Sequence, residues 1–373
     1  MKTTKIGIVG CGMISDTYFA ASKTFPMIEV VGCTDSIEER AKEKSEKYGV
    51  PAMSYEQLLN NPEIEIVLNL TPPLAHSKVD MDALNAGKHV YSEKPFGVDF
   101  DDARQVVELA QKKGLRVGCA PDTFLGGGLQ TCRKMIDDGW IGRPVAGTAI
   151  VAGRGPEKWP QAPFFYDYGA GPMLDLGPYY ITALVNMLGP AKSVVAKCTK
   201  GTEYRTLGAE VSPTYQKQYK PFDKYPVKVN THLTGVVEFQ NGVLITVISS
   251  FDVYRHGHNP IEIYGSEGSL ICPDPNTFGG NVKVFRKGFS TPDWKDVPYS
   301  HIYTENSRSI GIADMALALQ SNRNHRCSGE LAMHVLEIML AFDKSSAQNA
   351  PVLLSTTCER PEPLPLGLDK GEL

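Results

Sequence analysis

The chain has 373 residues, of which 42% are hydrophobic and 21% are charged, and its formal net charge is −4 at pH 7. This length exceeds what one hydrophobic core usually serves, so two domains are expected. No stretch reaches the roughly 18 consecutive apolar residues of a membrane span, and the net negative charge argues against nucleic acid as the main partner. The 8 cysteines are scattered without a C-x-x-C pair, which is typical of free thiols in a reducing compartment. We therefore expect a soluble, cytoplasmic protein.

Strand and helix signals alternate along the first 120 residues or so. Short apolar, β-branched runs predict strands, and helices are expected between them because capping residues precede the helical segments and glycines follow them. Ser36 with Glu39 and Ser54 with Gln57 match the capping-box pattern, and Asp99 is expected to cap a further helix. This alternation predicts a doubly wound parallel sheet, with a Rossmann domain at residues 1–121.

The character of the chain changes after residue 120, where short β-type runs dominate. Gln240-Asn241-Gly242 separates two of these runs and is a strong hairpin signal. A mixed or antiparallel sheet is expected in an α+β domain at residues 122–373, with helical periodicity at residues 130–138, 178–188, 312–319 and 331–342. The tail at residues 361–365 is too rich in proline for regular structure.

A glycine-rich segment follows the first predicted strand directly and opens the first helix, with the sequence Gly10-Cys11-Gly12-Met13-Ile14-Ser15. Gly10 would permit a tight turn, and Gly12 would let a pyrophosphate approach the backbone at the helix N-terminus. Ser15 stands where a third glycine is usual and is still small enough for close packing. We expect the loop from Gly10 to Ile14, with Gly12 and Met13 in its middle, to bind a dinucleotide.

Asp35 stands at the end of the second predicted strand, where a carboxylate can accept hydrogen bonds from the adenosine ribose hydroxyls. A negative charge at this position repels a 2′-phosphate, so NAD is expected in preference to NADP. The alternative is that Asp35 only caps the following helix.

Two further motifs narrow the class of protein. Thr71-Pro72-Pro73-Leu74-Ala75-His76 follows the third strand, and Glu93-Lys94-Pro95 ends the next one. With them, nearly the whole chain resembles the Gfo/Idh/MocA family of NAD(P)-dependent oxidoreductases, which includes glucose–fructose oxidoreductase and inositol dehydrogenase. The resemblance implies that Lys94 reaches both nicotinamide ribose and substrate and that Glu93 belongs to the cofactor site. It also implies that three residues line the nicotinamide side, namely Thr71, Pro72 and His76.

A second constellation lies at residues 171–180. Pro178 fits the first turn of a helix, so Asp175 is expected just before the helix N-terminus and Tyr179 in its first turn. Many members of the family carry Asp and His at these spacings. Tyr179 stands at the His position, as in the glucose–fructose oxidoreductases and dihydrodiol dehydrogenases that the chain resembles.

This departure suggests a mechanism. The Lys94 ammonium and the helix N-terminus would both favour the phenolate and lower the pKa of Tyr179. We hypothesise that Tyr179 exchanges a proton with the substrate hydroxyl, Lys94 supplies positive charge, and Asp175 orients one of them. Two alternatives stay open: Tyr179 could simply pack the domain junction, or Tyr180 could take its place.

Aromatic side chains gather at residues 159–168, where Trp159 and Tyr166 could form a wall against the apolar face of a sugar. Ordinary packing explains them nearly as well. The segment at residues 121–124 departs from an arginine-containing turn found in other family members, so substrate recognition cannot be copied from them. His256-Gly257-His258 has no evident third ligand, and no metal site is expected.

These features predict an NAD-dependent dehydrogenase acting on a secondary alcohol of a sugar, glycoside, polyol or cyclitol. The resemblance further implies a large, mainly antiparallel, open-faced sheet in the second domain and assembly into a homodimer or homotetramer. One alternative is a redox-assisted glycosidase, which would form no net NADH. Another is a sugar or NAD sensor that kept the fold and lost catalysis.

Overall fold

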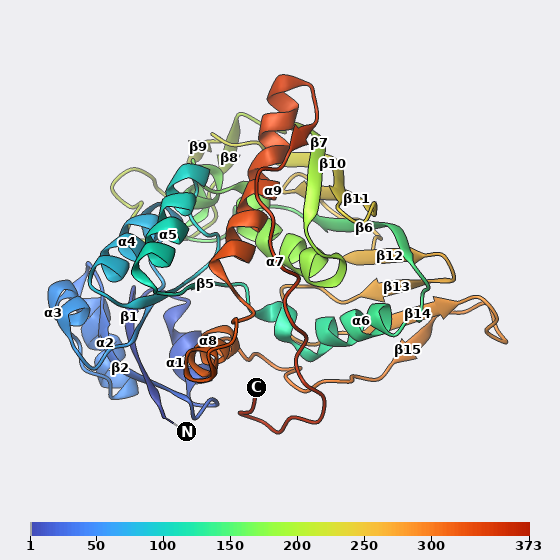
Figure 1. Cartoon of the computed structure of the whole chain (residues 1–373). Helices are drawn as coiled ribbons and strands as arrows, with labels where there is room; N and C mark the ends of the chain where they lie inside the picture. Colours follow the sequence, from blue (N-terminus) through green and yellow to red (C-terminus); the bar gives the residue numbers. More distant parts are fainter. Residues whose placement is uncertain (1) are drawn as a thin grey trace.

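The computed structural model describes residues 2–373 and contains two large sheets (Figure 1). The first is fully parallel and has the strand order β2-β1-β3-β4-β5. Its strands are β1 (Thr4–Val9), β2 (Ile28–Thr34), β3 (Ile66–Asn69), β4 (His89–Ser92) and β5 (Val117–Cys119). The helices between them are α1 (Ser15–Ser22), α2 (Glu38–Tyr48), α3 (Tyr55–Asn60), α4 (His76–Asn85) and α5 (Phe100–Lys113), with the 3-10 turn η1 (Pro73–Ala75) ahead of α4. The predicted Rossmann-type sheet is confirmed.

Most of the predicted helix boundaries follow from local capping. Ser54 and Gln57 form both bonds of the capping box at α3, and Asp99 accepts backbone N–H groups at the start of α5. One capping prediction is wrong. Helix α2 begins at Glu38 with Ile37 at its N-cap, and the Ile37 N–H donates to Asp35 Oδ1 at 2.9 Å. Because the Asp35 carboxylate already accepts this N–H, the Ser36 hydroxyl is left outside the helix start.

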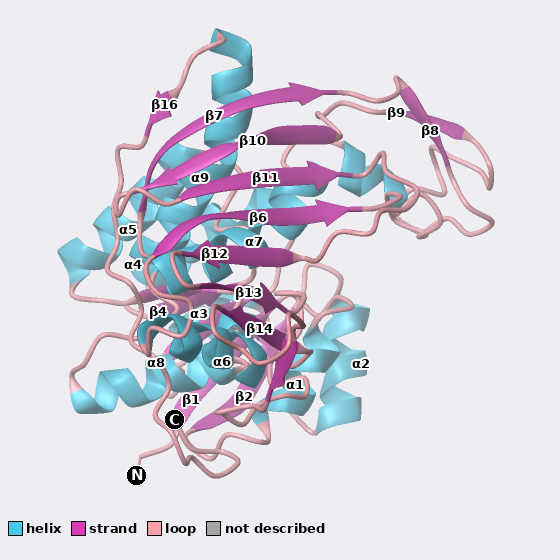
Figure 2. Ribbon diagram, turned by 90° about the vertical axis from the view of Figure 1, so that its right-hand side faces the viewer, coloured by secondary structure: helices cyan, strands magenta, loops and turns pink. Residues whose placement is uncertain are grey.

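The second sheet is large and mainly antiparallel, with the order β15-β14-β13-β12-β6-β11-β10-β7-β16, and only β6 and β11 pair in parallel among its strands (Figure 2). Its strands are β6 (Pro144–Ala152), β7 (Ala191–Thr199), β10 (His232–Phe239), β11 (Leu244–Ser250), β12 (Ile261–Gly265), β13 (Gly268–Cys272), β14 (Val282–Arg286), β15 (Lys295–Val297) and β16 (Val352–Leu353). The predicted hairpin joins β10 to β11, and Gly242 supplies the positive φ of 85° that its turn requires.

Helices cover one face of the second sheet. They are α6 (Gly127–Asp137), α7 (Gly171–Leu188) and α9 (Gly329–Gln348); α7 packs on β6 and β11, and α9 packs on β7 (Figure 2). A small separate sheet joins β8 (Tyr204–Thr206) to β9 (Lys224–Pro226), and two 3-10 turns are η2 (Thr123–Leu125) and η3 (Ala162–Tyr166). Among residues 2–373, no helix is long and apolar enough to cross a membrane.

The chain returns to the first sheet after the second is complete. The Cys119 N–H of β5 donates to the Cys327 carbonyl at 3.0 Å, and α8 (Ile310–Ser321) packs beside the same strand. The segment that follows α8 thus closes the outer edge of β5. Parts of the chain far apart in sequence therefore hold the two sheets together.

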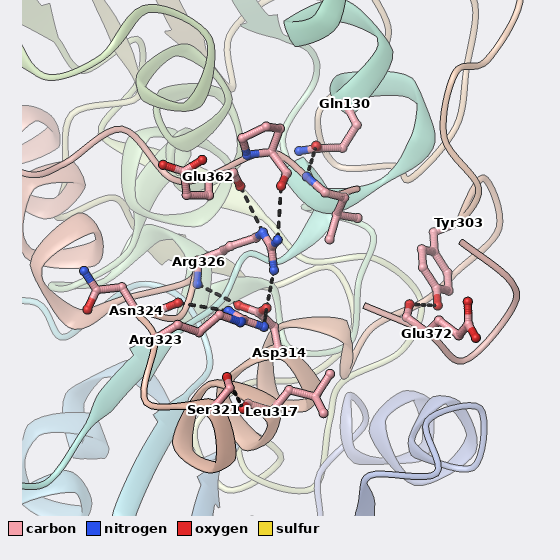
Figure 3. A network of polar contacts seen from close by, with 12 residues as sticks. Gln130, Tyr303, Asp314, Leu317, Ser321, Arg323, Asn324, Arg326, Glu362 and Glu372 are labelled. Atoms are coloured by element: carbon pink, nitrogen blue, oxygen red, sulfur yellow. Dashed lines mark hydrogen bonds and ion pairs between the residues drawn. The ribbon is translucent and has the colours of Figure 1, made fainter. Parts of the chain in front are cut away.

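The irregular C-terminal tail is bound by a buried ion cluster (Figure 3). Asp314 is fully buried and pairs with Arg323 at 2.6 Å and with Arg326. Arg326 in turn donates to the Glu362 carbonyl at 2.9 Å and the Pro363 carbonyl at 3.1 Å. The tail lacks regular structure, as predicted, and side chains satisfy its backbone instead.

Candidate active site

The predicted cofactor residues lie at one edge of the parallel sheet. The glycine-rich loop follows β1, Asp35 follows β2, Thr71 follows β3, and the Glu93–Lys94 pair follows β4. Strand order reverses between β1 and β3, and ligands of doubly wound sheets bind outside the carboxyl ends of the strands at such a switch point. The fold therefore brings motifs from four strands to one place.

Two glycines of the loop differ in what they require. Gly10 has a φ of +102°, and a Cβ there would lie 2.7 Å from the Leu70 carbonyl oxygen, so the turn needs glycine. A Cβ on Gly12 would meet no atom within 4 Å. Helix α1 starts just beyond, with no side-chain cap on its first N–H groups, and Met13 beside it is 76% exposed. Open space at Gly12 beside a helix N-terminus fits a dinucleotide pyrophosphate.

Asp35 connects the loop to the next helix. Its Oδ2 accepts the Cys11 N–H at 2.7 Å, and its Oδ1 accepts the Ile37 N–H at 2.9 Å. The side chain therefore binds the backbone just ahead of α2 and also fixes the glycine-rich loop. Each carboxylate oxygen can accept more than one hydrogen bond, so both retain capacity for ribose hydroxyls.

His76 and Glu93 are held inside the protein. His76 is 1% exposed, and its ring nitrogens lie 2.7 Å from the Thr71 carbonyl and 2.8 Å from the Pro95 carbonyl. Glu93 accepts the Tyr18 hydroxyl at 2.8 Å and the Lys94 N–H at 2.8 Å. Both side chains thus position the loops after β3 and β4. Thr71 is partly exposed and Pro72 is exposed.

Lys94 joins the two domains. Its Nζ donates to Asp175 Oδ1 at 2.9 Å and to the Asp175 carbonyl oxygen at 2.7 Å, and it lies 5.3 Å from the centre of the Tyr179 ring. The Lys94 and Asp175 side chains retain 17% and 22% of their surface. The structure therefore brings the three predicted catalytic residues together, one from the end of β4 and two from α7.

The start of α7 corrects the sequence prediction. The helix begins at Gly171, with Pro172 in its first turn, and Pro178 lies inside it. Asp175 and Tyr179 are thus both helical and one turn apart, on the same face. Burial of nearly all of α7 in the second domain outweighs the helix-breaking tendency of Pro178. Tyr179 consequently lies too far along the helix to feel its N-terminus, whose effect fades within the first turn.

The predicted lowering of the pKa of Tyr179 is also wrong for this structure. Burial raises the pKa of the phenol above its ordinary value, with Glu93 adding to the effect, while Lys94 and Arg308 oppose it. Burial also opposes the charge on Lys94, yet Asp175, Tyr179 and Glu93 together keep the pKa of Lys94 above its ordinary value. The resting site therefore holds an ammonium beside a neutral phenol.

Tyr180 is also buried, at 6% exposure, but it follows Tyr179 by about 100° around the helix, and burial and the Asp274 charge raise its pKa. The contacts thus favour Tyr179 as the partner of Lys94. Arg308, whose charge opposes the rise in the pKa of Tyr179, was missed by sequence reasoning. It lies in no motif and is far from both α7 and β4 in sequence, so no local signal could have found it.

The aromatic residues predicted to contact substrate differ in how deeply they are buried. Tyr166 is fully buried against Tyr225 and Phe251, with ring centres 5.6 Å and 5.7 Å away, so its predicted contact with substrate is wrong. Trp159 is 52% exposed and packs edge-on against Phe165. Between residues 2 and 373, no group of three or more His, Cys, Asp or Glu side chains could hold a metal ion.

The fold and the site define a dinucleotide-binding domain joined to an α+β domain that supplies polar groups to it. The model of an oxidoreductase family with an NAD-binding Rossmann fold matches residues 4–120, and that of the GFO/IDH/MocA C-terminal domain matches residues 129–271. The chain therefore belongs to the Gfo/Idh/MocA family.

Relatives of this chain include sugar and cyclitol dehydrogenases. Inositol 2-dehydrogenase of Salmonella typhimurium is 38% identical over 168 residues, which make up 43% of this chain and 50% of that enzyme. The chain thus matches about half the length of this relative. Levoglucosan dehydrogenase of Pseudarthrobacter phenanthrenivorans is 23% identical over 297 residues, 73% of this chain and 74% of that enzyme. The solved apo levoglucosan dehydrogenase has the same fold, with a TM-score of 0.83 at 20% identity over 96% of this chain and 100% of that one.

Proposed function

We propose that this protein is an NAD-dependent dehydrogenase that transfers a hydride between NAD and a secondary alcohol of a sugar, glycoside, polyol or cyclitol. The observation that carries the proposal is the contact of Lys94 with Asp175 and Tyr179, made at the carboxyl end of β4. Inositol 2-dehydrogenase and levoglucosan dehydrogenase, both similar to this chain, support the substrate class. A solved levoglucosan dehydrogenase contains NADH and levoglucosan.

Each of the three residues has its own role. Tyr179 exchanges a proton with the substrate hydroxyl, while Lys94 stabilises the negative charge that develops on the same oxygen. Asp175 holds the Lys94 ammonium by two hydrogen bonds and so fixes its position. Bound NAD accepts or supplies the hydride, and Trp159 offers an aromatic face to the substrate.

We also propose that NAD is preferred over NADP. Gly10, Gly12, Met13 and Ile14 would hold the pyrophosphate, and the Asp35 carboxylate would accept hydrogen bonds from the ribose and repel a 2′-phosphate. Since all 8 cysteines are free thiols, a reducing compartment such as the cytoplasm suits the protein.

The test is formation of NADH or NADPH across a panel of inositols, sugars, polyols and glycosides. We expect net NADH with at least one secondary alcohol. Tyr179→Phe should lower kcat by at least about 100-fold with the Kd for NAD unchanged, because the phenol exchanges the proton. Tyr180→Phe, which removes the neighbouring hydroxyl, is the matched control and should stay within about twofold. Glycoside cleavage without net NADH would support the glycosidase instead, and NAD binding without any turnover would support the sensor.

We further propose that the open face of the second sheet pairs with a second copy of the chain. Helices α7 and α9 cover only one face, and apolar side chains on the other face are exposed, including Val195 at 46% and Leu244 at 49%. An apolar sheet face open to water is typical of an interface. A homodimer, or a homotetramer built from two such pairs, follows.

A further inference from the structure

Both ring nitrogens of His76 face backbone carbonyl oxygens. Nε2 lies 2.7 Å from the Thr71 oxygen and Nδ1 lies 2.8 Å from the Pro95 oxygen, and the residue is 1% exposed. A carbonyl oxygen can only accept a hydrogen bond, whereas a neutral imidazole has one N–H donor and one acceptor nitrogen. A neutral ring would therefore point a lone pair at one of the two oxygens. Both contacts become hydrogen bonds only if each ring nitrogen carries a proton.

Other buried histidines of the chain have surroundings that suit a neutral ring. Nε2 of His334 accepts the Ala191 N–H at 3.0 Å, and its Nδ1 lies 2.8 Å from the Thr356 hydroxyl. Burial lowers the pKa of His334 to about 4, in agreement with these contacts. His301 faces one carbonyl oxygen and one hydroxyl, and the hydroxyl can donate to the second nitrogen. Among residues 2–373, His76 alone has a carbonyl oxygen opposite each nitrogen.

A buried carboxylate can balance the second proton. Asp80 lies one turn beyond His76 on α4 and is 1% exposed. Its Oδ1 accepts the Asn69 amide at 2.7 Å and the Ser92 hydroxyl, and these donors and the His76 charge oppose the rise that burial causes in the pKa of Asp80. Balance is needed, because the N-terminus of α4 disfavours a cation at its first residue. An imidazolium and a carboxylate in one network cost less to bury together than either charge alone.

Two other titratable groups lie near Asp80, namely Glu93 after β4 and Cys119 of β5. The Cys119 thiol donates to the Glu93 carbonyl oxygen at 3.5 Å, and burial, with the charges of Asp80 and Glu93, raises its pKa well above the ordinary value. The thiol therefore stays neutral. The Glu93 carboxylate already accepts two hydrogen bonds from other groups. Asp80 is thus the group left to balance a charge on His76.

We infer that His76 is an imidazolium, paired through this network with Asp80, and that its charge positions the loops after β3 and β4. The Thr71 carbonyl belongs to the first loop, and the Pro95 carbonyl directly follows Lys94 in the second. Hydrogen bonds from a charged donor are roughly twice as strong as neutral ones, so the ring holds both loops to one point. His76 is therefore a positioning residue for Lys94 and for the cofactor side of the site. Its effect on turnover rests on the proposed function.

The direct test is nitrogen-15 NMR of the intact protein with labelled histidine. An imidazolium has a proton on each ring nitrogen, whereas a neutral ring leaves one nitrogen bare. At about pH 7.5, where exposed imidazoles are mostly neutral, we expect a bare nitrogen from all but one of the 8 histidines. His76→Gln should remove the pair of protonated signals, while His334 should keep one bare nitrogen. A bare nitrogen from every histidine overturns the inference, even if no variant folds.

A second test asks whether the charge positions the loops. Asp80→Asn removes the balancing charge with little change of shape, so His76 should acquire a bare nitrogen. Because a hydrogen bond to a charged group is lost, both Asp80→Asn and His76→Gln should weaken NAD binding and lower kcat/KM by about tenfold. Asp82→Asn, the same change on the half-exposed side of α4, is the matched control and should behave as the wild type.

The outcomes separate this inference from the proposed function. If the imidazolium is seen and NAD binding weakens as expected, but no alcohol is oxidised, the proposed function fails while the inference holds. If both variants bind NAD as the wild type does, the charge does not position the loops and the inference is overturned.

Discussion

Asp122 shows how one buried carboxyl group can serve the geometry of a site at a cost in stability. It is 1% exposed, and its Oδ2 accepts two backbone N–H groups from the turn that carries Arg308. Burial raises the pKa of Asp122 from 3.8 to about 6, although the Gly311 N–H and the Arg308 charge oppose the change. The ionised form thus holds the turn, but its burial is unfavourable.

The sign of the resulting pH dependence follows from proton linkage. A carboxyl group whose pKa is higher in the folded state binds its proton more tightly there, so its contribution to stability falls as pH rises from about 4 to about 6. Asp122→Asn removes this titration and keeps an oxygen for the two N–H groups. We expect the stability of Asp122→Asn relative to wild type to increase by about 2 kcal/mol between pH 4 and pH 7.

Thermal unfolding of both proteins across this pH range measures the effect as a difference in Tm. Glu46→Gln on the exposed side of α2 is the control and should give a difference independent of pH. A pH-independent difference for Asp122→Asn as well would mean that Asp122 keeps an ordinary pKa in the folded protein.

At the scale of elements, the two glycines in the turn from β1 to α1 are needed for different reasons. One is required for folding, and the other is required for cofactor binding. A Cβ at Gly10 would collide with the Leu70 backbone, whereas a Cβ at Gly12 would enter open space. Gly10→Ala should therefore lower Tm and weaken NAD binding together. Gly12→Ala should keep the wild-type Tm but weaken NAD binding by about tenfold or more, because the methyl group occupies the place of the pyrophosphate.

Each variant serves as the matched control of the other, since the chemical change is the same. Calorimetric melting of the apo-protein and titration with NAD give the two quantities separately. Unchanged NAD affinity in Gly12→Ala would show that the pyrophosphate does not approach the backbone at this glycine.

Elements with a strong local signal were predictable from the sequence, and those fixed by tertiary contacts were not. The run at residues 232–239 has the alternation of a strand and matches β10. Strand β6 was missed because its β-branched residues are interrupted by alanines and by Gly147, where a Cβ would lie 2.3 Å from the Glu262 carbonyl of the next strand. The close approach of β12 requires that glycine, but only the structure reveals it.

The same distinction between local sequence signals and tertiary contacts applies to the residues of the site. Lys94, Asp175 and Tyr179 lie in short motifs whose resemblance to a family is visible in the sequence, and the structure brings them together. The environment of Tyr179 was not predictable, because the start of α7 depends on its burial in the second domain, and the pKa of Tyr179 depends first on burial and then on charges that include Arg308 from a distant loop. Local patterns predicted which residues meet but did not predict how they are solvated.

At the scale of the whole molecule, the second sheet has an outer face that its helices leave uncovered. Inward side chains on β10, such as Leu233 and Val237, are buried against the helices, while Val236 points outward. Strand pairing places Val236 between Val195 of β7 and Thr246 of β11. This apolar row is the expected centre of contact with a second copy.

A lysine at this centre should therefore prevent assembly. Val236→Lys would bury an unpaired ammonium in each partner, which costs several kcal/mol per pair and weakens association by about 100-fold or more. The side chain can reach water in the monomer, so the fold should persist with a nearly unchanged circular dichroism spectrum. Light scattering should show an oligomer for wild type and a monomer for the variant at the same concentration. Asn60→Lys adds the same charge on exposed α3 and should remain oligomeric. An assembly of wild-type mass in Val236→Lys would show that the interface lies elsewhere. The exposed apolar side chains of this face would then have to contact a different partner.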